Sequence, residues 1–144
     1  MKYTFEYQPA PVIRDYHINS PESFPESFYK EIFPQHEFEE RMWAVYLNNA
    51  KKVITAEMVG QGDLSSCSIN SMKVYRSAIL LAATGVILIH NHPSNNKRMS
   101  LADKSITQLI GKGLKAVNSR LYDHLIYTRD GVVSLASEGI LHDC

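Results

Sequence analysis

The run Val-Ile-Leu-Ile at residues 86–89 is the feature that most constrains how this chain folds. It is continuous, apolar and as long as a short strand, so it predicts a β-strand covered on both faces. Helical patterns lie on both sides of it, one opening at Ser71 and the other at Ser100. Because helices are the usual cover for such a strand, we expect an α/β fold with a mixed sheet flanked by helices.

Four further segments have the composition of strands and fall into two pairs. The first pair is separated by two asparagines that suit a turn, and the second pair by an Arg-Asp-Gly turn. The predicted order is therefore strand, strand, helix, strand, helix, strand, strand. The pairs are residues 42–47 with 52–59, and residues 121–127 with 132–135.

Each helical pattern has one apolar face, produced by residues spaced three and four apart. Glycines are expected to end both helices, the first at Gly85 and the second near Gly111 to Gly113. The residues expected to face the core are Val74, Ala78, Leu81 and Ala82 in the first helix, and Ile106, Leu109 and Ile110 in the second.

The first 35 residues have weaker patterns and are expected to form an arm with a short helix, residues 1–35, packed on a domain of residues 36–144. Ser20 followed by Pro21 suits the start of a short helix or turn. A second helical segment at residues 26–33 is expected to stop at Pro34. Alternating aromatic residues near the N-terminus suit an edge strand or an extended arm: Tyr3, Phe5 and Tyr7.

The chain has 144 residues, of which 44% are apolar, so it is long enough for one core and too short for two ordinary domains. Its 15 basic residues balance its 15 acidic residues, which leaves no overall field to attract nucleic acid or an anionic membrane. No apolar run approaches the roughly 20 residues of a membrane span, and the N-terminus lacks a secretory pattern. Cys67 and Cys144 are interpreted as free thiols, and we expect a cytoplasmic location without membrane partners.

Candidate metal ligands gather where the central apolar run ends, in the sequence His90-Asn91-His92. Residues two apart on an extended segment point to the same side, so both imidazoles can face one point. A helix that begins shortly afterwards can return Asp103 to that point. Two neutral imidazoles and a carboxylate suit Zn²⁺, and three protein ligands leave a fourth position for water, which is the pattern of a catalytic site.

Each part of this pattern also has a simpler interpretation. A histidine pair at this spacing is, on its own, more often structural than metal-binding. Ser100 and Asp103 also match a variant of the helix capping box, in which the serine hydroxyl accepts the amide of Asp103. The serine can cap the helix and still lie beside the metal, so the two interpretations are compatible.

A hydrolytic zinc site also needs a base that takes a proton from water, and a carboxylate is the usual choice. Glu39 and Glu40 stand just before the predicted strand at residues 42–47. One of them would lie beside the metal if that strand neighbours the strand at residues 86–89. Local sequence alone favours a solvated helix end for both.

A longer signature now resembles a known family. The JAMM (JAB/MPN) metalloenzymes carry His-x-His, seven residues, then Ser-x-x-Asp, which is matched here by His90-Asn91-His92-Pro93-Ser94 followed by Ser100 and Asp103. The chain is most similar to the RadC-type branch, whose members are labelled DNA repair proteins. That branch carries a later Asp-His pair before apolar residues, as at Asp123-His124, and the resemblance runs from about Glu40 to Leu141.

The resemblance implies a cytidine-deaminase-like JAB/MPN sandwich with zinc as cofactor. Carried over by position, it makes His90, His92 and Asp103 the metal ligands, Glu40 the base and Ser100 the serine near the reacting carbonyl. The implied activity is hydrolysis of a peptide or isopeptide bond, with a protein or peptide as substrate. A zinc deaminase is disfavoured because the Cys-x-x-Cys ligand pair is missing.

The chain departs from the family pattern in places that remove no ligand. Residues 95–99, Asn-Asn-Lys-Arg-Met, replace the usual Pro-Ser-Gly loop with its further prolines and add local positive charge. Residues 71–76 replace the customary Pro-Arg-Glu start, although Arg76 keeps a basic residue nearby. We also expect a short form of the family, without the N-terminal helical region that often precedes this domain.

Two other classes of function compete with hydrolysis. One is a non-catalytic, zinc-stabilised binding module that acts with DNA-processing or mobile-element proteins. The other is a factor that contacts DNA through Lys97, Arg98 and Lys104, which no basic stripe or interleaved aromatic residues support. Asp123 and His124 have no ligand-like spacing of their own, so they either orient a ligand or close the sheet, and the structural role is favoured.

Overall fold

The computed structural model describes residues 13, 15–18, 20, 24–62 and 69–139. These residues form three helices and five strands: the short helix α1 comes first, and two helices and five strands follow it in the predicted order. The elements are α1 (Glu26–Ile32), β1 (Arg41–Leu47), β2 (Val53–Gln61), α2 (Ser71–Leu80), β3 (Gly85–Asn91), α3 (Leu101–Ala116), β4 (Leu121–Thr128) and β5 (Gly131–Ser134).

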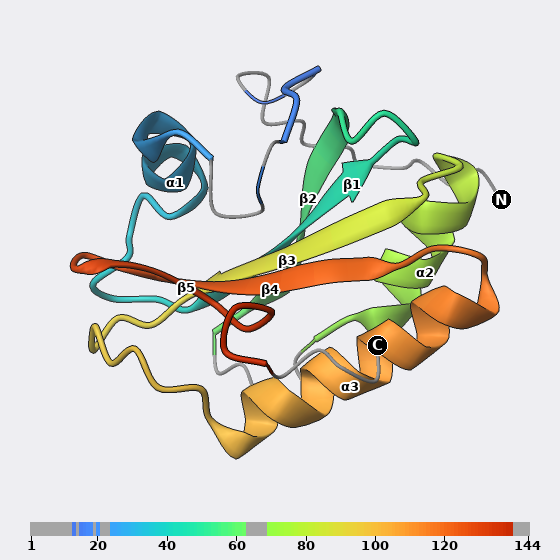
Figure 1. Cartoon of the computed structure of the whole chain (residues 1–144). Helices are drawn as coiled ribbons and strands as arrows, with labels where there is room; N and C mark the ends of the chain where they lie inside the picture. Colours follow the sequence, from blue (N-terminus) through green and yellow to red (C-terminus); the bar gives the residue numbers. More distant parts are fainter. Residues whose placement is uncertain (1–12, 14, 19, 21–23, 63–68, 140–144) are drawn as a thin grey trace, which may run out of the picture.

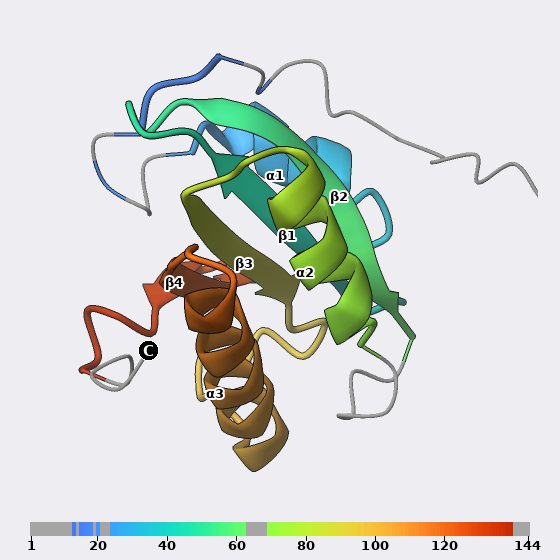
Figure 2. The ribbon, with the colours of Figure 1, turned by 90° about the vertical axis from the view of Figure 1, so that its right-hand side faces the viewer.

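The strands form one mixed sheet in the order β2-β1-β3-β4-β5. Only the β3–β4 pair is parallel among these neighbours, and the other pairs are antiparallel. The helix α1 lies on one face of the sheet, while α2 and α3 lie on the other (Figures 1 and 2). The prediction of an α/β fold with a mixed sheet flanked by helices is confirmed.

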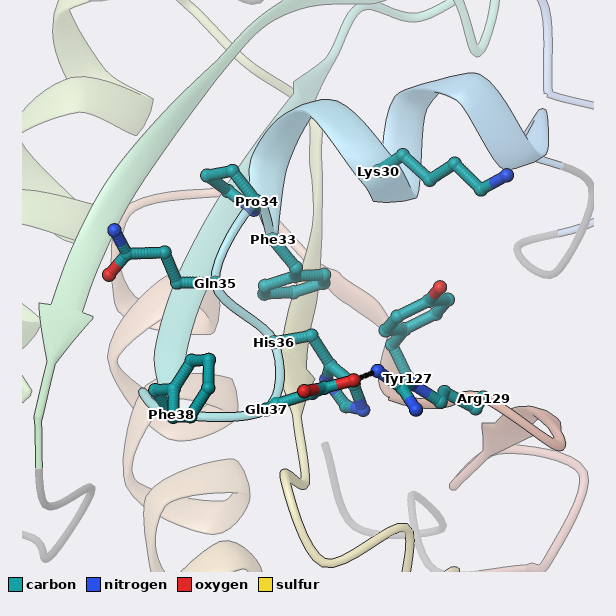
Figure 3. A pocket seen from close by; sticks show the side chains of 9 residues that line it. All are labelled: Lys30, Phe33, Pro34, Gln35, His36, Glu37, Phe38, Tyr127 and Arg129. Atoms are coloured by element: carbon teal, nitrogen blue, oxygen red, sulfur yellow. Dashed lines mark ion pairs between the residues drawn. The ribbon is translucent and has the colours of Figure 1, made fainter.

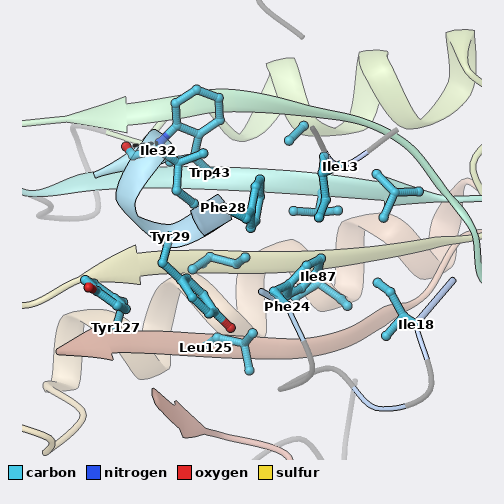
Figure 4. Close-up of a cluster of buried hydrophobic side chains, with 14 of the residues drawn as sticks. Ile13, Ile18, Phe24, Phe28, Tyr29, Ile32, Trp43, Ile87, Leu125 and Tyr127 are labelled. Carbon is cyan, nitrogen blue, oxygen red and sulfur yellow. Dashed lines mark hydrogen bonds between the residues drawn. The ribbon is translucent and has the colours of Figure 1, made fainter. Parts of the chain in front are cut away.

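Alternating side chains of the central strands fill two separate apolar layers. On the α1 face, Trp43 and Val45 of β1 join a cluster that includes Phe28 and Ile32 of α1 (Figure 4). On the opposite face, Met42 and Ala44 of β1 belong to a second cluster. This cluster also contains Val74 and Ala78 of α2 and Ile106 and Ile110 of α3. Every residue of β3 is buried, which explains why its sequence is a continuous apolar run.

Two glycines that were expected to end helices have a different role. The helix α2 ends at Leu80, before Gly85, and α3 continues through Gly113 to Ala116. A Cβ at Gly85 would lie 1.9 Å from the ring of Tyr122, and one at Gly113 would lie 2.2 Å from the ring of Tyr75. Both glycines therefore make room for a tyrosine from another element, a contact that local sequence does not reveal.

The buried stripes of the helices also differ slightly from the predicted ones. Leu109 was expected to face the core but is 53% exposed, because the buried stripe of α3 runs through Ile106, Ile110 and Leu114. Ala82 is likewise exposed, since it lies beyond the end of α2 and has a positive φ of 50°. In the part of the chain that the structure describes, no helix is long and apolar enough to cross a membrane.

The helix α1 is part of the same core as the sheet. Its side chains Phe28, Tyr29 and Ile32 are buried, and the indole Nε1 of Trp43 donates a hydrogen bond to the carbonyl oxygen of Ile32 (3.0 Å). The helix ends one residue before the predicted limit, with Phe33 as its C-cap. The predicted N-terminal strand at Tyr3 to Tyr7, the helix start at Pro21, and Cys67 and Cys144 lie outside the described residues.

Candidate metal centre

The end of β3 presents its last residues to both faces of the sheet. His90 follows Val86 and Leu88 on the face covered by α2 and α3, while Asn91 points to the α1 face. His92 follows immediately after the strand, and its backbone N–H donates to the carbonyl of Tyr127 on β4 (3.0 Å). The first turn of α3 then brings Asp103 beneath both histidines.

Three side chains converge at this point, as the sequence predicted. The Nε2 atoms of His90 and His92 each lie 3.2 Å from one oxygen of the Asp103 carboxylate, and 2.8 Å from one another. His90 is fully buried and Asp103 is 3% exposed. The ligand atoms of all three lie within 4.8 Å of one another, so the group can hold a metal ion.

The hydrogen bonds behind His92 define which of its ring nitrogens carries hydrogen. Its Nδ1 lies 2.6 Å from the carbonyl oxygen of Asn96. A carbonyl can only accept, so Nδ1 is the N–H donor. In the neutral ring, Nε2 then has a free lone pair that points at Asp103 and His90.

A longer chain of hydrogen bonds defines in the same way which ring nitrogen of His90 carries hydrogen. The hydroxyl of Thr107 donates to the carbonyl of Asp103 (2.7 Å), so its oxygen accepts from Nδ1 of His124 (2.6 Å). The Nε2 of His124 then accepts from Nδ1 of His90 (2.6 Å). The Nε2 of His90 therefore also has a free lone pair, which points into the cluster.

His124 suits this chain because it stays neutral. Complete burial lowers its pKa well below the usual value, and the neighbouring His90 lowers the pKa further. A neutral imidazole can accept at one nitrogen and donate at the other, which the chain from His90 to Thr107 requires.

The electrostatics of the cluster favour a cation. Burial alone would raise the pKa of Asp103, but its contacts with the side chains of His90 and His92, together with the hydrogen bond from the Ser100 N–H, hold the pKa well below its usual value. Burial would lower the pKa of His92, yet Asp103, the Asn96 carbonyl and the charge of Glu40 together raise it. Two nitrogen lone pairs and a carboxylate thus need a positive charge between them, either a proton or a metal ion.

The donor set also has the right size for a metal ion. Tetrahedral coordination with bonds of about 2.0–2.2 Å separates neighbouring ligand atoms by roughly 3.3 Å. The separations of 2.8 and 3.2 Å in the cluster are close to this value. Imidazole nitrogen and carboxylate oxygen suit divalent transition metals such as Zn²⁺, so the residues present fit the ion that the sequence implied.

The two candidate bases differ in their surroundings. Met42 pairs with His90 in the antiparallel β1–β3 ladder, and the Arg41 N–H donates to the side-chain oxygen of Asn91 (2.8 Å). Glu40 belongs to the face of Met42 and His90, and its charge acts on His92. The carboxylate of Glu39, by contrast, is bound by the side chains of Gln61 and Arg41.

Ser100 is the N-cap of α3 and forms a complete capping box with Asp103. The Oγ of Ser100 accepts the Asp103 N–H (3.0 Å), and the Oδ2 of Asp103 accepts the Ser100 N–H (2.9 Å). The capping bond uses a lone pair of the hydroxyl, so its hydrogen is left for another acceptor. The capping box is confirmed, and it leaves Asp103 compatible with the role of a metal ligand.

Asn91 and His36 support the site from the opposite face, a role that the sequence did not reveal. The Nδ2 of Asn91 donates to the carbonyl of Glu39 (2.9 Å) and lies 3.0 Å from Nδ1 of His36. The Nε2 of His36 lies 2.9 Å from the side-chain oxygen of Asn95. This network ties the segment before Glu40 and the loop after His92 to the end of β3.

The structure separates the roles of Asp123 and His124. Asp123 accepts hydrogen bonds from the backbone N–H groups of His124 and Ala136 and from the hydroxyl of Ser134. It therefore fixes the end of β5 and the residues just after it against β4. His124 instead contacts the candidate ligand His90. Thr107 was also missed, although its position four residues after Asp103 on the same helix face was a usable signal.

The fold and this cluster together define a JAB-type domain with a candidate metal site. The family model for the RadC-like JAB domain matches residues 18–140, and the chain belongs to this family. It is 37% identical over 102 residues to the UPF0758 protein YfjY of Escherichia coli K12, covering 71% of this chain and 64% of that protein.

Other relatives are similar at the same level. The chain is 38% identical over 104 residues to a UPF0758 protein of Porphyromonas gingivalis, covering 72% of this chain and 46% of the relative. It is 33% identical over 105 residues to a UPF0758 protein of Pelodictyon phaeoclathratiforme, covering 73% of this chain and 47% of the relative. The matched region thus spans about half the length of most of the curated relatives cited.

Proposed function

We propose that this domain is a zinc-dependent hydrolase of the JAMM type that cleaves a peptide or isopeptide bond in a protein or peptide substrate. His90, His92 and Asp103 hold the zinc ion, Glu40 is the general base, and Ser100 contacts the reacting carbonyl. The observation that carries the proposal is the convergence of two imidazole lone pairs and a buried carboxylate beside the face on which Glu40 lies.

The chain's own groups supply the remaining steps. A bound zinc ion would act as a Lewis acid that lowers the pKa of a water molecule. Glu40 accepts the proton of this water and later returns it to the leaving amine, which a single carboxylate can do in both directions. The hydroxyl hydrogen of Ser100, left over from the capping bond, donates to the oxygen of the attacked carbonyl as negative charge develops there.

Zinc binding and hydrolysis are tested with separate variants. Zinc in the purified protein is quantified by plasma mass spectrometry, and Asp103→Ala is expected to abolish stoichiometric zinc. Hydrolysis is followed with a library of quenched fluorogenic peptides and an isopeptide-linked analogue. Undiminished zinc in Asp103→Ala would show that the ligand assignment is wrong.

Adjacent glutamates give a matched pair for the catalytic step. Glu40→Gln is expected to keep zinc and to lose at least about 100-fold in rate, the usual contribution of a general base. Glu39→Gln makes the same chemical change one residue away, at a side chain bound by Gln61 and Arg41, and is expected to keep full activity. Equal rates for the two variants would contradict the role of Glu40.

The same pair separates hydrolysis from the competing function, a zinc-stabilised binding module acting with DNA-processing or mobile-element proteins. Such a module would keep its function in Glu40→Gln. A DNA-contacting role has little structural support, because the ammonium of Lys97 already donates to the carbonyl of Asp130 (3.1 Å). Repair of DNA is therefore not part of the proposal.

A further inference from the structure

A pocket lies beside the metal centre, on the α1 side of the sheet edge (Figure 3). Its volume is about 490 Å³, within the usual range for ligand sites. The segment after α1 forms most of the wall, including Phe33, His36, Glu37 and Phe38. Lys30 of α1 and, at the end of β4, Tyr127 and Arg129 complete it.

Aromatic rings give the pocket a rigid apolar wall. Phe33 and Tyr127 stack with centroids 5.4 Å apart and an interplanar angle of 14°, and Tyr29 stacks on Tyr127 in the same way at 5.1 Å. The ring of His36 meets Tyr127 edge-on at 5.2 Å. Phe33 and Tyr127 are only 4% and 8% exposed, so their positions are fixed by the core.

Phe38 is a third aromatic residue of the pocket and is 85% exposed, more than any other large hydrophobic side chain described. Its backbone is held by a tight turn, in which Phe38 N–H and Glu39 N–H both donate to the carbonyl of Gln35 (3.0 and 3.1 Å). An apolar ring held in water by an ordered turn is typical of a binding surface.

Among the side chains that line the pocket, Lys30 and Arg129 are cations and Glu37 is an anion. Arg129 pairs with Glu37 across the pocket, as the dashed line in Figure 3 marks. The carboxylate of Glu26 adjoins this lining and accepts a hydrogen bond from the Tyr127 hydroxyl (3.1 Å). Lys30 has no ion-pair partner within the described part of the chain, so it is the cation that a ligand carboxylate can meet beside the apolar rings.

Direct hydrogen bonds connect the pocket to the metal centre. The carbonyl of Tyr127 accepts the N–H of the candidate ligand His92 (3.0 Å). His36 contacts Asn91, which lies between the two candidate histidine ligands. Phe38 is two residues before Glu40 in the chain, and the Asn91 side chain also donates to the carbonyl of the intervening Glu39 (2.9 Å).

We propose that this pocket binds a peptide segment of the substrate, in which a large apolar or aromatic side chain stands next to an acidic residue, outside the bond that is cleaved. This inference rests on the proposed function, because it assigns a binding subsite to that reaction. The apolar side chain packs on Phe33, Phe38 and Tyr127, and the carboxylate lies near Lys30. A phosphate backbone fits less well, because Glu37 also lines the pocket and only one cation is in excess.

The test measures binding without cleavage, in the Glu40→Gln full chain. The probe is an acetylated and amidated pentapeptide Gly-Asp-Phe-Asp-Gly, compared with versions that carry alanine for phenylalanine or lysine for both aspartates. Amide chemical shifts are recorded by NMR during titration. We expect saturable shifts at residues 33–38 and 127–129 with the first peptide and at least about fivefold weaker binding of the other two.

Variants with matched controls locate the contact. Phe38→Ala is expected to weaken peptide binding about tenfold, and Leu80→Ala, also an exposed apolar residue but on α2, is expected to leave it unchanged. Lys30→Glu is expected to weaken binding about fivefold at low salt, and Lys112→Glu on α3 not at all. The large exposure of Phe38 makes its truncation compatible with folding, which the same spectra verify.

The outcomes separate this inference from the proposed function. Binding that depends on Phe38 without any cleavage by the wild type would keep the pocket and refute the hydrolase. Cleavage whose KM is unchanged in Phe38→Ala and Lys30→Glu would keep the hydrolase and refute the pocket. A single-stranded oligothymidine that shifts the same amides more tightly than the peptide would overturn the peptide assignment in favour of nucleic acid.

Discussion

Thr107→Val probes the hydrogen-bond chain behind His90 with almost no change in side-chain volume. Thr107 is fully buried, and its hydroxyl donates to the Asp103 carbonyl while it accepts from His124. In the variant, the Nδ1–H of His124 has lost its acceptor. His124 avoids this by moving its hydrogen to Nε2, where it donates to His90. His90 must then carry its own hydrogen on Nε2, the atom that faces Asp103.

The expected loss of zinc affinity equals the free energy needed to move the His124 hydrogen back from Nε2 to Nδ1. Metal binding needs a free lone pair on Nε2 of His90. In the variant, His124 must then again carry its hydrogen on Nδ1, where this buried N–H has no acceptor. An unsatisfied buried donor costs about 1–3 kcal/mol, which corresponds to roughly 5- to 150-fold weaker metal binding. This range agrees with the roughly 10- to 100-fold effect typical of groups that orient metal ligands.

The assay is a competitive zinc titration against a chromophoric chelator, combined with urea unfolding of the metal-free protein. Thr107→Ser keeps the hydroxyl and is expected to retain nearly wild-type affinity. Thr55→Val is the matched control, because the Thr55 hydroxyl is buried and has no partner among the described residues. Unchanged zinc affinity in Thr107→Val, or an equal loss in Thr55→Val, would refute the assigned hydrogen-bond chain.

Three further predictions concern the surroundings of the site. Asn91→Ala leaves the Arg41 amide and the Glu39 carbonyl without their partner, so unfolding in urea should show a loss of about 3 kcal/mol; a loss within error of zero would show that the network is unimportant. Asp123→Asn keeps an acceptor oxygen for the N–H groups of His124 and Ala136 but places an NH2 group against the Ser134 hydroxyl, and it should cost about 1–3 kcal/mol, while zinc stoichiometry by mass spectrometry stays at the wild-type value. Adding zinc to chelator-treated protein at 100 times its Kd should stabilise it by about 2.7 kcal/mol and raise the melting temperature in calorimetry by roughly 5–10 °C; magnesium at the same concentration should have no effect.

The sequence predicted the sheet well because the central strands are buried on both faces. Residues 86–89 and 42–47 have no polar position to interrupt them, so their strand character is visible locally. The convergence of the candidate ligands His90, His92 and Asp103 was predicted for a similar reason, since the alternation of a strand and the start of a helix place them by spacing alone. Residues whose role depends on a distant partner were harder to interpret.

Gly85 and Gly113 illustrate that difficulty. Each looks like a helix terminator in sequence, but each accommodates a tyrosine ring from an element far along the chain. The surroundings of Glu39 are of the same kind, because its contact with Gln61, a residue of β2, depends on how the strands pair. His124 could not be assigned from spacing, since only the parallel pairing of β4 with β3 brings it to His90.

The double role of Asp103 has a consequence for how the domain opens. Fraying of the first turn of α3 breaks the bond between the Asp103 amide and Ser100, and it withdraws the same carboxylate from His90 and His92. A metal ion bound by that carboxylate would therefore hold the helix end closed. The hydrogen exchange rate of the Asp103 backbone amide would report how strongly such an ion stabilises this turn.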